Sequence, residues 1–179
     1  MRPYSRSGLF KRLSALALVI ACAQPCAARI VYTPTHIVLH NTGTMPIDLN
    51  NDGTTDLTIQ QSFTQPGCYL FYAAAELPRG TSVVSTTSGP DGFWASALNQ
   101  GQTIGRVDSF VGSSAVLTDV YTLPYCPFPH GYGLWGNAGP HYLGISFTKN
   151  SHVRYAWVEL DVSFTIWRPF PGITTTLMG

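Results

Sequence analysis

The strongest constraint on the fold is a strict alternation of apolar and polar residues near the end of the chain. Residues 152–167 (HVRYAWVELDVSFTIW) carry an apolar side chain at every second position from Ala156 to Ile166. The preceding segment 142–148 (YLGISFT) alternates in the same way, and a short polar turn separates the two. Because successive side chains of a strand point to opposite faces, this pattern predicts an antiparallel hairpin with one buried face.

The rest of the chain after residue 28 also predicts strands. No segment there shows a convincing 3.6-residue apolar period. From residue 73 to 121 the signal is weak, because Gly, Ser and Thr dominate. Segments rich in β-branched or aromatic residues are 36–40, 57–63 and 68–72. We therefore expect an all-β fold, an antiparallel β-sandwich or jelly-roll-like single domain.

The first 28 residues have the anatomy of a secretory signal peptide. Basic residues precede a short apolar run, Leu13 to Ala21, and small residues follow it as candidate cleavage sites. The run is about half of the roughly 20 residues that a membrane-spanning helix needs. We expect residues 1–28 to be removed, residues 29–179 to form one domain without a membrane span, and the protein to be secreted or periplasmic. The alternative is a lipid anchor at Cys22, which ends a lipobox-like tetrapeptide.

Cleavage after Ala28 leaves two cysteines, Cys68 and Cys126. In an oxidising compartment an even pair predicts a disulfide. Closing a loop of about 60 residues would stabilise the fold by roughly 4 kcal/mol in the chain-entropy description. The alternative is a pair of unrelated buried thiols. Neither cysteine has a second Cys or a His at the spacing of a zinc site.

Segment 48–56 (DLNNDGTTD) has the spacing of a calcium-binding loop. Oxygen-bearing side chains alternate along it, and Gly53 permits a sharp turn. The ligands that this spacing predicts for a structural Ca²⁺ are Asp48, Asn50, Asp52, Asp56 and the main-chain carbonyl of Thr54. Ile59 stands where an EF-hand has its bidentate glutamate, so we expect modest affinity. The alternative is an Asx-rich turn whose carboxylates accept hydrogen bonds from backbone amides.

The composition supplies few charged residues from which an active site or a nucleic-acid-binding surface could be built. Charged residues make up 11% of the chain and the net charge is +1, so no basic field is available for nucleic acid. The histidines are scattered and no nucleophile motif accompanies them. Glu159 and Asp161 share one strand face, and exposed acidic residues in such a position are usually solvated side chains without a catalytic role. We therefore predict a non-enzymatic protein with no catalytic residues.

Aromatic residues on the polar face of the final hairpin suggest a second function. Tyr142, Tyr155 and Trp157 lie opposite the apolar stripe. Flat rings beside polar groups can stack on sugars, which predicts a carbohydrate-binding or adhesion module with a glycan or cell-surface partner. The competing explanation is that these rings pack against the second sheet of a sandwich.

Four segments in order resemble a group of uncharacterised bacterial secreted proteins, many of which carry a PEP-CTERM sorting tail. The segments are IDLNNDGTTDLTI (47–59), LPRGTSV (77–83), WGNAGPHYLGISF (135–147) and HVRYAWVELDV (152–162). The resemblance matches the loop residues above to the group's DLDGDG-like loop, and the two hairpin segments to its YLGxxF and HYGWxxL strands. Ala156 stands where the group has Gly, and no sorting tail is present. The group implies export but no activity.

Overall fold

The computed structural model describes residues 35–64, 69–89, 92–122, 130–136, 139–165 and 171–179. All of them belong to one compact unit, Thr33–Gly179. The expected signal peptide and Cys22 lie outside the described residues. Within the described ranges, no helix is long and apolar enough to cross a membrane.

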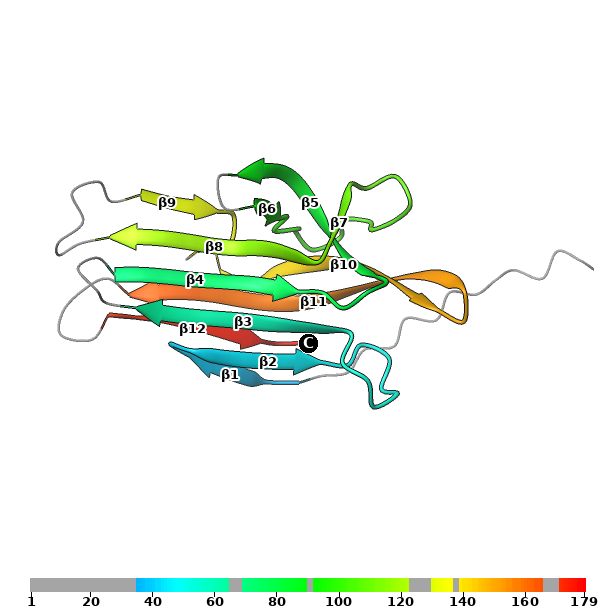
Figure 1. Ribbon diagram of the computed structural model, residues 1–179, viewed down its shortest axis with the longest axis horizontal. Coiled ribbons are helices and arrows are strands. Elements are labelled where there is room, and N and C mark those ends of the chain that lie inside the picture. Colours follow the sequence, from blue (N-terminus) through cyan, green and yellow to red (C-terminus); the bar gives the residue numbers. More distant parts are fainter. Residues whose placement is uncertain (1–34, 65–68, 90–91, 123–129, 137–138, 166–170) are drawn as a thin grey trace, which may run out of the picture. The chain divides into compact units, whose positions relative to one another are not determined.

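The described residues form twelve strands, which confirms the all-β prediction (Figure 1). The strands are β1 (Ile37–His40), β2 (Gly43–Ile47), β3 (Leu57–Thr64), β4 (Tyr69–Glu76), β5 (Thr81–Gly89), β6 (Gly92–Ala95), β7 (Phe110–Gly112), β8 (Ser114–Thr122), β9 (His130–Gly133), β10 (His141–Lys149), β11 (His152–Thr165) and β12 (Gly172–Leu177).

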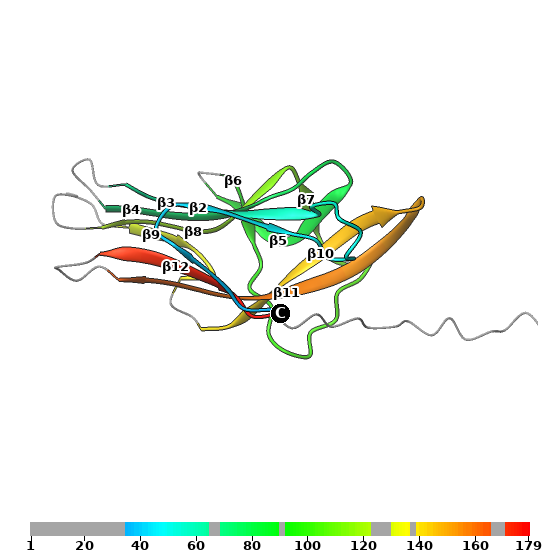
Figure 2. The same ribbon diagram turned by 90° about the horizontal axis from the view of Figure 1, so that it is seen from below.

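Hydrogen bonds join all twelve strands in one sheet, and ten of them follow one another in a continuous path. Their order is β1-β12-β11-β10-β5-β6-β8-β4-β3-β2, with β7 beside β5 and β9 beside β8. Among the described strands, every pairing is antiparallel except the short parallel contact of β6 with β8 at Trp94 and Val116. The sheet folds over, so that the run β2, β3, β4 and β8 faces the run β11 and β12 (Figure 2).

The β10–β11 hairpin has the predicted buried face. Leu143 pairs with Val158 and Lys149 with His152, which leaves a two-residue turn. Both turn residues have positive φ, 51° at Asn150 and 61° at Ser151, as a two-residue hairpin turn of type I′ requires. The side chains of Leu143, Ile145, Val158 and Leu160 are buried, as the alternation predicts.

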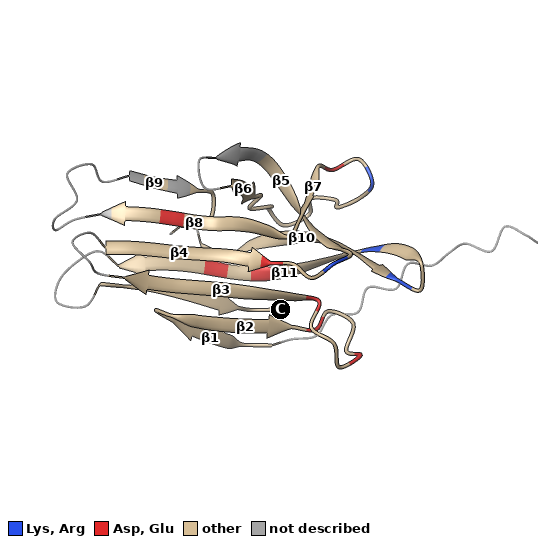
Figure 3. Cartoon of the chain, viewed as in Figure 1, with Lys and Arg blue, Asp and Glu red and all other residues tan. Residues whose placement is uncertain are grey.

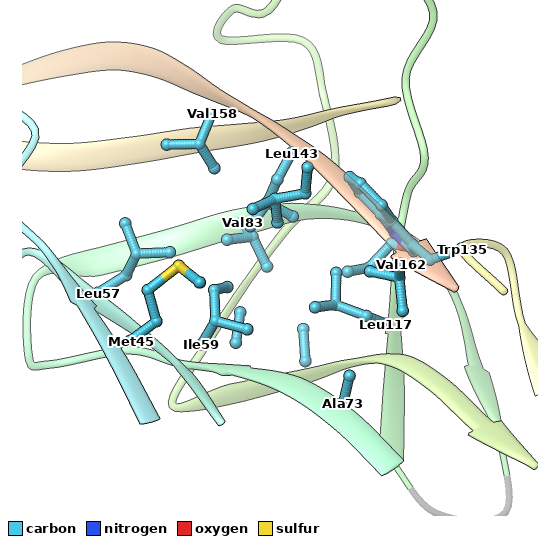
Figure 4. Close-up of a cluster of buried hydrophobic side chains, with 14 of the residues drawn as sticks. Met45, Leu57, Ile59, Ala73, Val83, Leu117, Trp135, Leu143, Val158 and Val162 are labelled. Atoms are coloured by element: carbon cyan, nitrogen blue, oxygen red, sulfur yellow. The ribbon is translucent and has the colours of Figure 1, made fainter. Parts of the chain in front are cut away.

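The hydrophobic core lies between the two facing runs of strands (Figure 4). Met45, Leu57 and Ile59 enter it from β2 and β3, while Val158 and Val162 enter from β11. Contacts of Phe71 and Gln61 are among those that tie the runs together. The ring of Phe71 on β4 stacks on Phe164 of β11, with 5.6 Å between centroids. The Gln61 side chain on β3 donates from Nε2 to the Ile173 carbonyl of β12, at 3.1 Å.

Strands β5 and β8 form where the sequence signal is weak. Their sequences, TSVVSTTSG and SAVLTDVYT, contain few large apolar residues. Even so, Thr118 and Asp119 of β8 are as buried as the neighbouring Leu117. The run Ala73–Ala75 of β4, a helix-favouring composition, is fully buried as a strand between β3 and β8. Tertiary pairing therefore decides these elements.

Candidate functional site

The acidic loop that connects β2 to β3 is closed at its base by the strands. Ile47 and Leu57 are register partners, and the amide of Asp56 donates to the Ile47 carbonyl at 2.8 Å. Inside the loop, Asp48 Oδ2 accepts from the Gly53 amide at 2.8 Å. Its Oδ1 accepts from the amides of Asn50 at 3.2 Å and Asp52 at 3.3 Å. One carboxylate thus organises most of the turn.

The other two carboxylates of the loop also accept hydrogen bonds from within it. Asp56 Oδ2 accepts from the Leu49 amide at 2.8 Å and from Asn50 Nδ2 at 3.0 Å. Asp52 Oδ1 accepts from the Thr54 amide at 3.0 Å. Backbone and side-chain amides therefore replace the solvent that these oxygens would otherwise bind.

A cation reaches this loop from the tip of the β10–β11 hairpin. Lys149 Nζ donates to Asn50 Oδ1 and, at 3.2 Å, to Asp52 Oδ2. In Figure 3 the acidic loop and the basic hairpin tip lie at the same end of the view. Lys149 was not predicted at this loop from the sequence, because 97 positions separate it from Asp52 and no local pattern connects the two.

The carboxylates of Asp48 and Asp52 are held in their charged form. The Lys149 hydrogen bond, with help from the Thr54 amide, lowers the pKa of Asp52. At Asp48 desolvation raises the pKa, but the backbone amides of the loop, that of Gly53 first, together lower it below its ordinary value. Both groups are therefore ionised at neutral pH.

The loop geometry matches the Asx-rich turn more closely than a preformed metal site. Among the described residues, no group of three or more His, Cys, Asp or Glu side chains is placed to hold a metal ion. The predicted ligands Asp48, Asn50, Asp52 and Asp56 instead bond to amides and to Lys149, and Thr54 is exposed. Carboxylate oxygens retain further acceptor capacity beyond these bonds, so calcium binding stays a prediction.

A pocket of about 300 Å³ lies on the outer face of β10 and β11. Two aromatic side chains of these strands, Tyr142 and Trp157, form one side of it, and their rings meet edge to face with centroids 5.1 Å apart. The other side comes from the segment between β6 and β7. It contributes Leu98, Asn99, Gln100, Gly101, Gln102 and Ile104.

Backbone pairing and a glycine hold this segment against the strands. Leu98 and Tyr142 exchange two backbone hydrogen bonds, of 3.0 and 2.9 Å. Gly144, the register partner of Trp157, lies under the segment: a Cβ there would be 2.8 Å from Leu98 Cδ1. The absence of a side chain at this position lets Leu98 approach the sheet. The pocket wall was missed in the sequence because segment 98–104 has no strand or motif signal.

The structure brings the three predicted sugar-stacking residues to one face. Tyr142 and Trp157 are partly exposed in the pocket, and Tyr155 is 40% exposed beside it. The ring of Phe110, on β7, lies 5.9 Å from that of Tyr155. Residues of the segment between β6 and β7, and of β7 itself, cover part of this face. The rings are thus accessible rather than enclosed.

Cys68 and Cys126 lie outside the described residues, so the predicted disulfide is not placed by the structure. Their neighbours are described, however, and Tyr69 of β4 pairs with Thr122 of β8. Comparison of the chain with models of protein families, with curated proteins and with solved structures finds no match.

Proposed function

We propose that this chain is an exported, non-enzymatic module that binds a neutral carbohydrate in the pocket beside Tyr142 and Trp157. The observation that carries this proposal is the lining of the pocket. Two aromatic rings face a wall that includes Asn99, Gln100 and Gln102, and none of the described residues that line the cavity is charged.

This lining suits the chemistry of a sugar. A pyranose has an apolar C–H face, which packs on an aromatic ring, and a rim of hydroxyl groups. Side-chain amides both donate and accept, so they can bond to hydroxyls of either orientation. The volume of about 300 Å³ is at the lower end for ligand pockets and suits one or two sugar units. Hydrolysis of a glycosidic bond normally needs two carboxyl groups, and the described residues that line this pocket supply none, so binding is the better proposal.

A binding assay with defined sugars tests this function. We expect oligosaccharides from a panel of neutral glucans, mannans, xylans and galactans to change the fluorescence of the protein saturably. Trp157→Ala should weaken binding by about tenfold, as loss of an aromatic contact implies. Phe93→Ala is the matched control, because Phe93 is 48% exposed and lies outside the pocket lining. Absence of saturable binding across the panel would contradict the proposal.

We also propose that the chain is exported and that its fold is a β-sandwich. The order of loop and hairpin segments supports membership of the exported group, and the two facing runs of strands support a β-sandwich. N-terminal analysis of protein recovered from an expressing bacterium tests export: we expect a mature chain that begins at Arg29. An acylated N-terminal Cys22 would support the lipid anchor instead.

For the acidic loop, we propose that Ca²⁺ and the Lys149 ammonium are alternative occupants. The spacing of Asp48, Asn50, Asp52 and Asp56 supports a cation at this place, and Lys149 supplies one in the structure. A divalent ion would have to displace the ammonium, which is a physical reason for weak affinity in addition to the missing bidentate glutamate.

A further inference from the structure

A second aromatic pair continues the face that carries the pocket. Tyr155 lies two positions from Trp157 on β11, so both side chains point to the same side, about 7 Å apart along the strand. Tyr155 meets Phe110 with 5.9 Å between ring centroids, as Trp157 meets Tyr142 at 5.1 Å. Each pair therefore combines one residue of β11 with one from another strand.

The cross-strand neighbours leave these rings accessible. The register partner of Trp157 on β10 is Gly144, and that of Tyr155 is Ser146. Neither carries a large side chain that would cover the adjacent ring. Tyr155 is 40% exposed, and the next outward-facing region along β11 is the hairpin tip, where Val153 is 57% exposed.

The two pairs differ in their surroundings. The first has the amide-rich wall of segment 98–104 beside it, whereas the pocket lining does not extend to Tyr155 or Phe110. A ligand confined to the pocket would leave the second pair unused. A ligand that runs along β11 would meet a pocket and then an open ring pair about 7 Å further along the strand.

We propose that the carbohydrate is a linear chain that lies along β11, with one unit in the pocket and another over Tyr155 and Phe110. This inference rests on the proposed function and specifies its ligand: an internal or terminal stretch of a neutral polysaccharide rather than a single sugar. The pocket provides selectivity through its amides, and the second pair provides additional stacking area.

A chain-length series tests the inference. The probes are glucose to cellohexaose and mannose to mannohexaose, titrated by calorimetry into the full mature chain. We expect affinity for a series that binds to rise by about tenfold or more between the monosaccharide and the hexasaccharide. Tyr155→Ala should remove most of this rise and leave the monosaccharide affinity unchanged, while Tyr155→Phe should retain it. Trp157→Ala should weaken every length.

The possible results distinguish failure of the extended site from failure of sugar binding in the pocket. Equal affinity for short and long chains, or a Tyr155→Ala protein with the full length dependence, would overturn the extended site and leave the pocket intact. Absence of binding for every saccharide would overturn the proposed function and the inference together. Phe93→Ala should behave as the unmodified protein, and melting curves should show that each variant is folded.

Discussion

Lys149 Nζ lies 3.2 Å from Asp52 Oδ2, although the two residues are 97 positions apart in the chain. The contact joins the tip of the β10–β11 hairpin to the loop between β2 and β3. Both side chains remain about 40% exposed, at 41% and 39%, so solvent screens the pair and it contributes little to global stability. Its importance is local, because it sets the charge inside the candidate calcium loop.

Calcium should raise the melting temperature if it occupies this loop. The mature protein would be heated in millimolar Ca²⁺ and in chelator, with Mg²⁺ as a control for ionic strength. A ligand that binds the folded state stabilises it in proportion to the logarithm of its concentration above Kd. We expect a rise of a few degrees that Asp48→Asn abolishes. Coincident curves in calcium and chelator would instead identify the loop as an Asx-rich turn.

Replacement of Lys149 tests whether the ammonium and calcium compete. Lys149→Met removes the cation and retains an apolar stem of similar length. We expect the calcium-dependent rise in melting temperature to become larger than in the unmodified protein, because no ammonium must be displaced. Arg154→Met, at an exposed position of the same hairpin, controls for a change in net charge. An unchanged or smaller calcium response in Lys149→Met would argue against competition.

The predicted disulfide can be tested by thiol labelling. Cys68 directly precedes Tyr69, and Cys126 follows Thr122 by four residues; Tyr69 and Thr122 are register partners. Four residues span at most about 14 Å when extended, so the strand pairing allows the two cysteines to meet. We expect the exported mature protein to take up no alkylating reagent before reduction and two equivalents after it. Two reactive thiols without reductant would favour the alternative of separate cysteines.

The all-β class and the final hairpin were predictable from the sequence, because in these parts the local residue pattern agrees with the tertiary pairing of the strands. The hairpin of 142–167 has one apolar face, and period two alone establishes it as far as the described residues extend. Strands β5 and β8 were not predicted, because their buried positions include the polar residues Ser85, Thr118 and Asp119, which interrupt an apolar alternation. Such residues enter a core because neighbouring strands supply partners, which a local pattern does not record.

The candidate sites were likewise predictable only in part. The loop residues and the rings of Tyr142 and Trp157 were identified because they lie in short, regular segments. Lys149 and the wall formed by segment 98–104 were not, because each reaches its site through a contact between distant parts of the chain. Spacing predicts which side chains share a face, but not which other segment covers that face.

The buried amide of Gln61 should contribute to global stability. Its Nε2 donates to the carbonyls of Leu39 and Ile173, and its Oε1 accepts from Thr175 Oγ1 at 2.6 Å. Gln61→Met keeps most of the volume but leaves buried polar groups without this partner, which costs about 1–3 kcal/mol. Urea unfolding should show a lower midpoint with an unchanged slope. Gln60→Met, at an exposed neighbouring position, should change the midpoint little; an equal loss in both variants would contradict this role.

Gly144 should be required for the pocket wall as well as for packing. A Cβ at this position would lie 2.8 Å from Leu98 Cδ1 and 3.1 Å from Ile104 Cγ1, and both residues line the pocket. Gly144→Ala therefore should displace segment 98–104, lower the free energy of unfolding by about 1–3 kcal/mol and weaken sugar binding. Gly105→Ala is the control, because nothing lies within 4 Å of its Cβ position. Urea unfolding and calorimetric titration measure the two effects, and sugar affinity equal to that of Gly105→Ala would show that the pocket does not depend on this close approach.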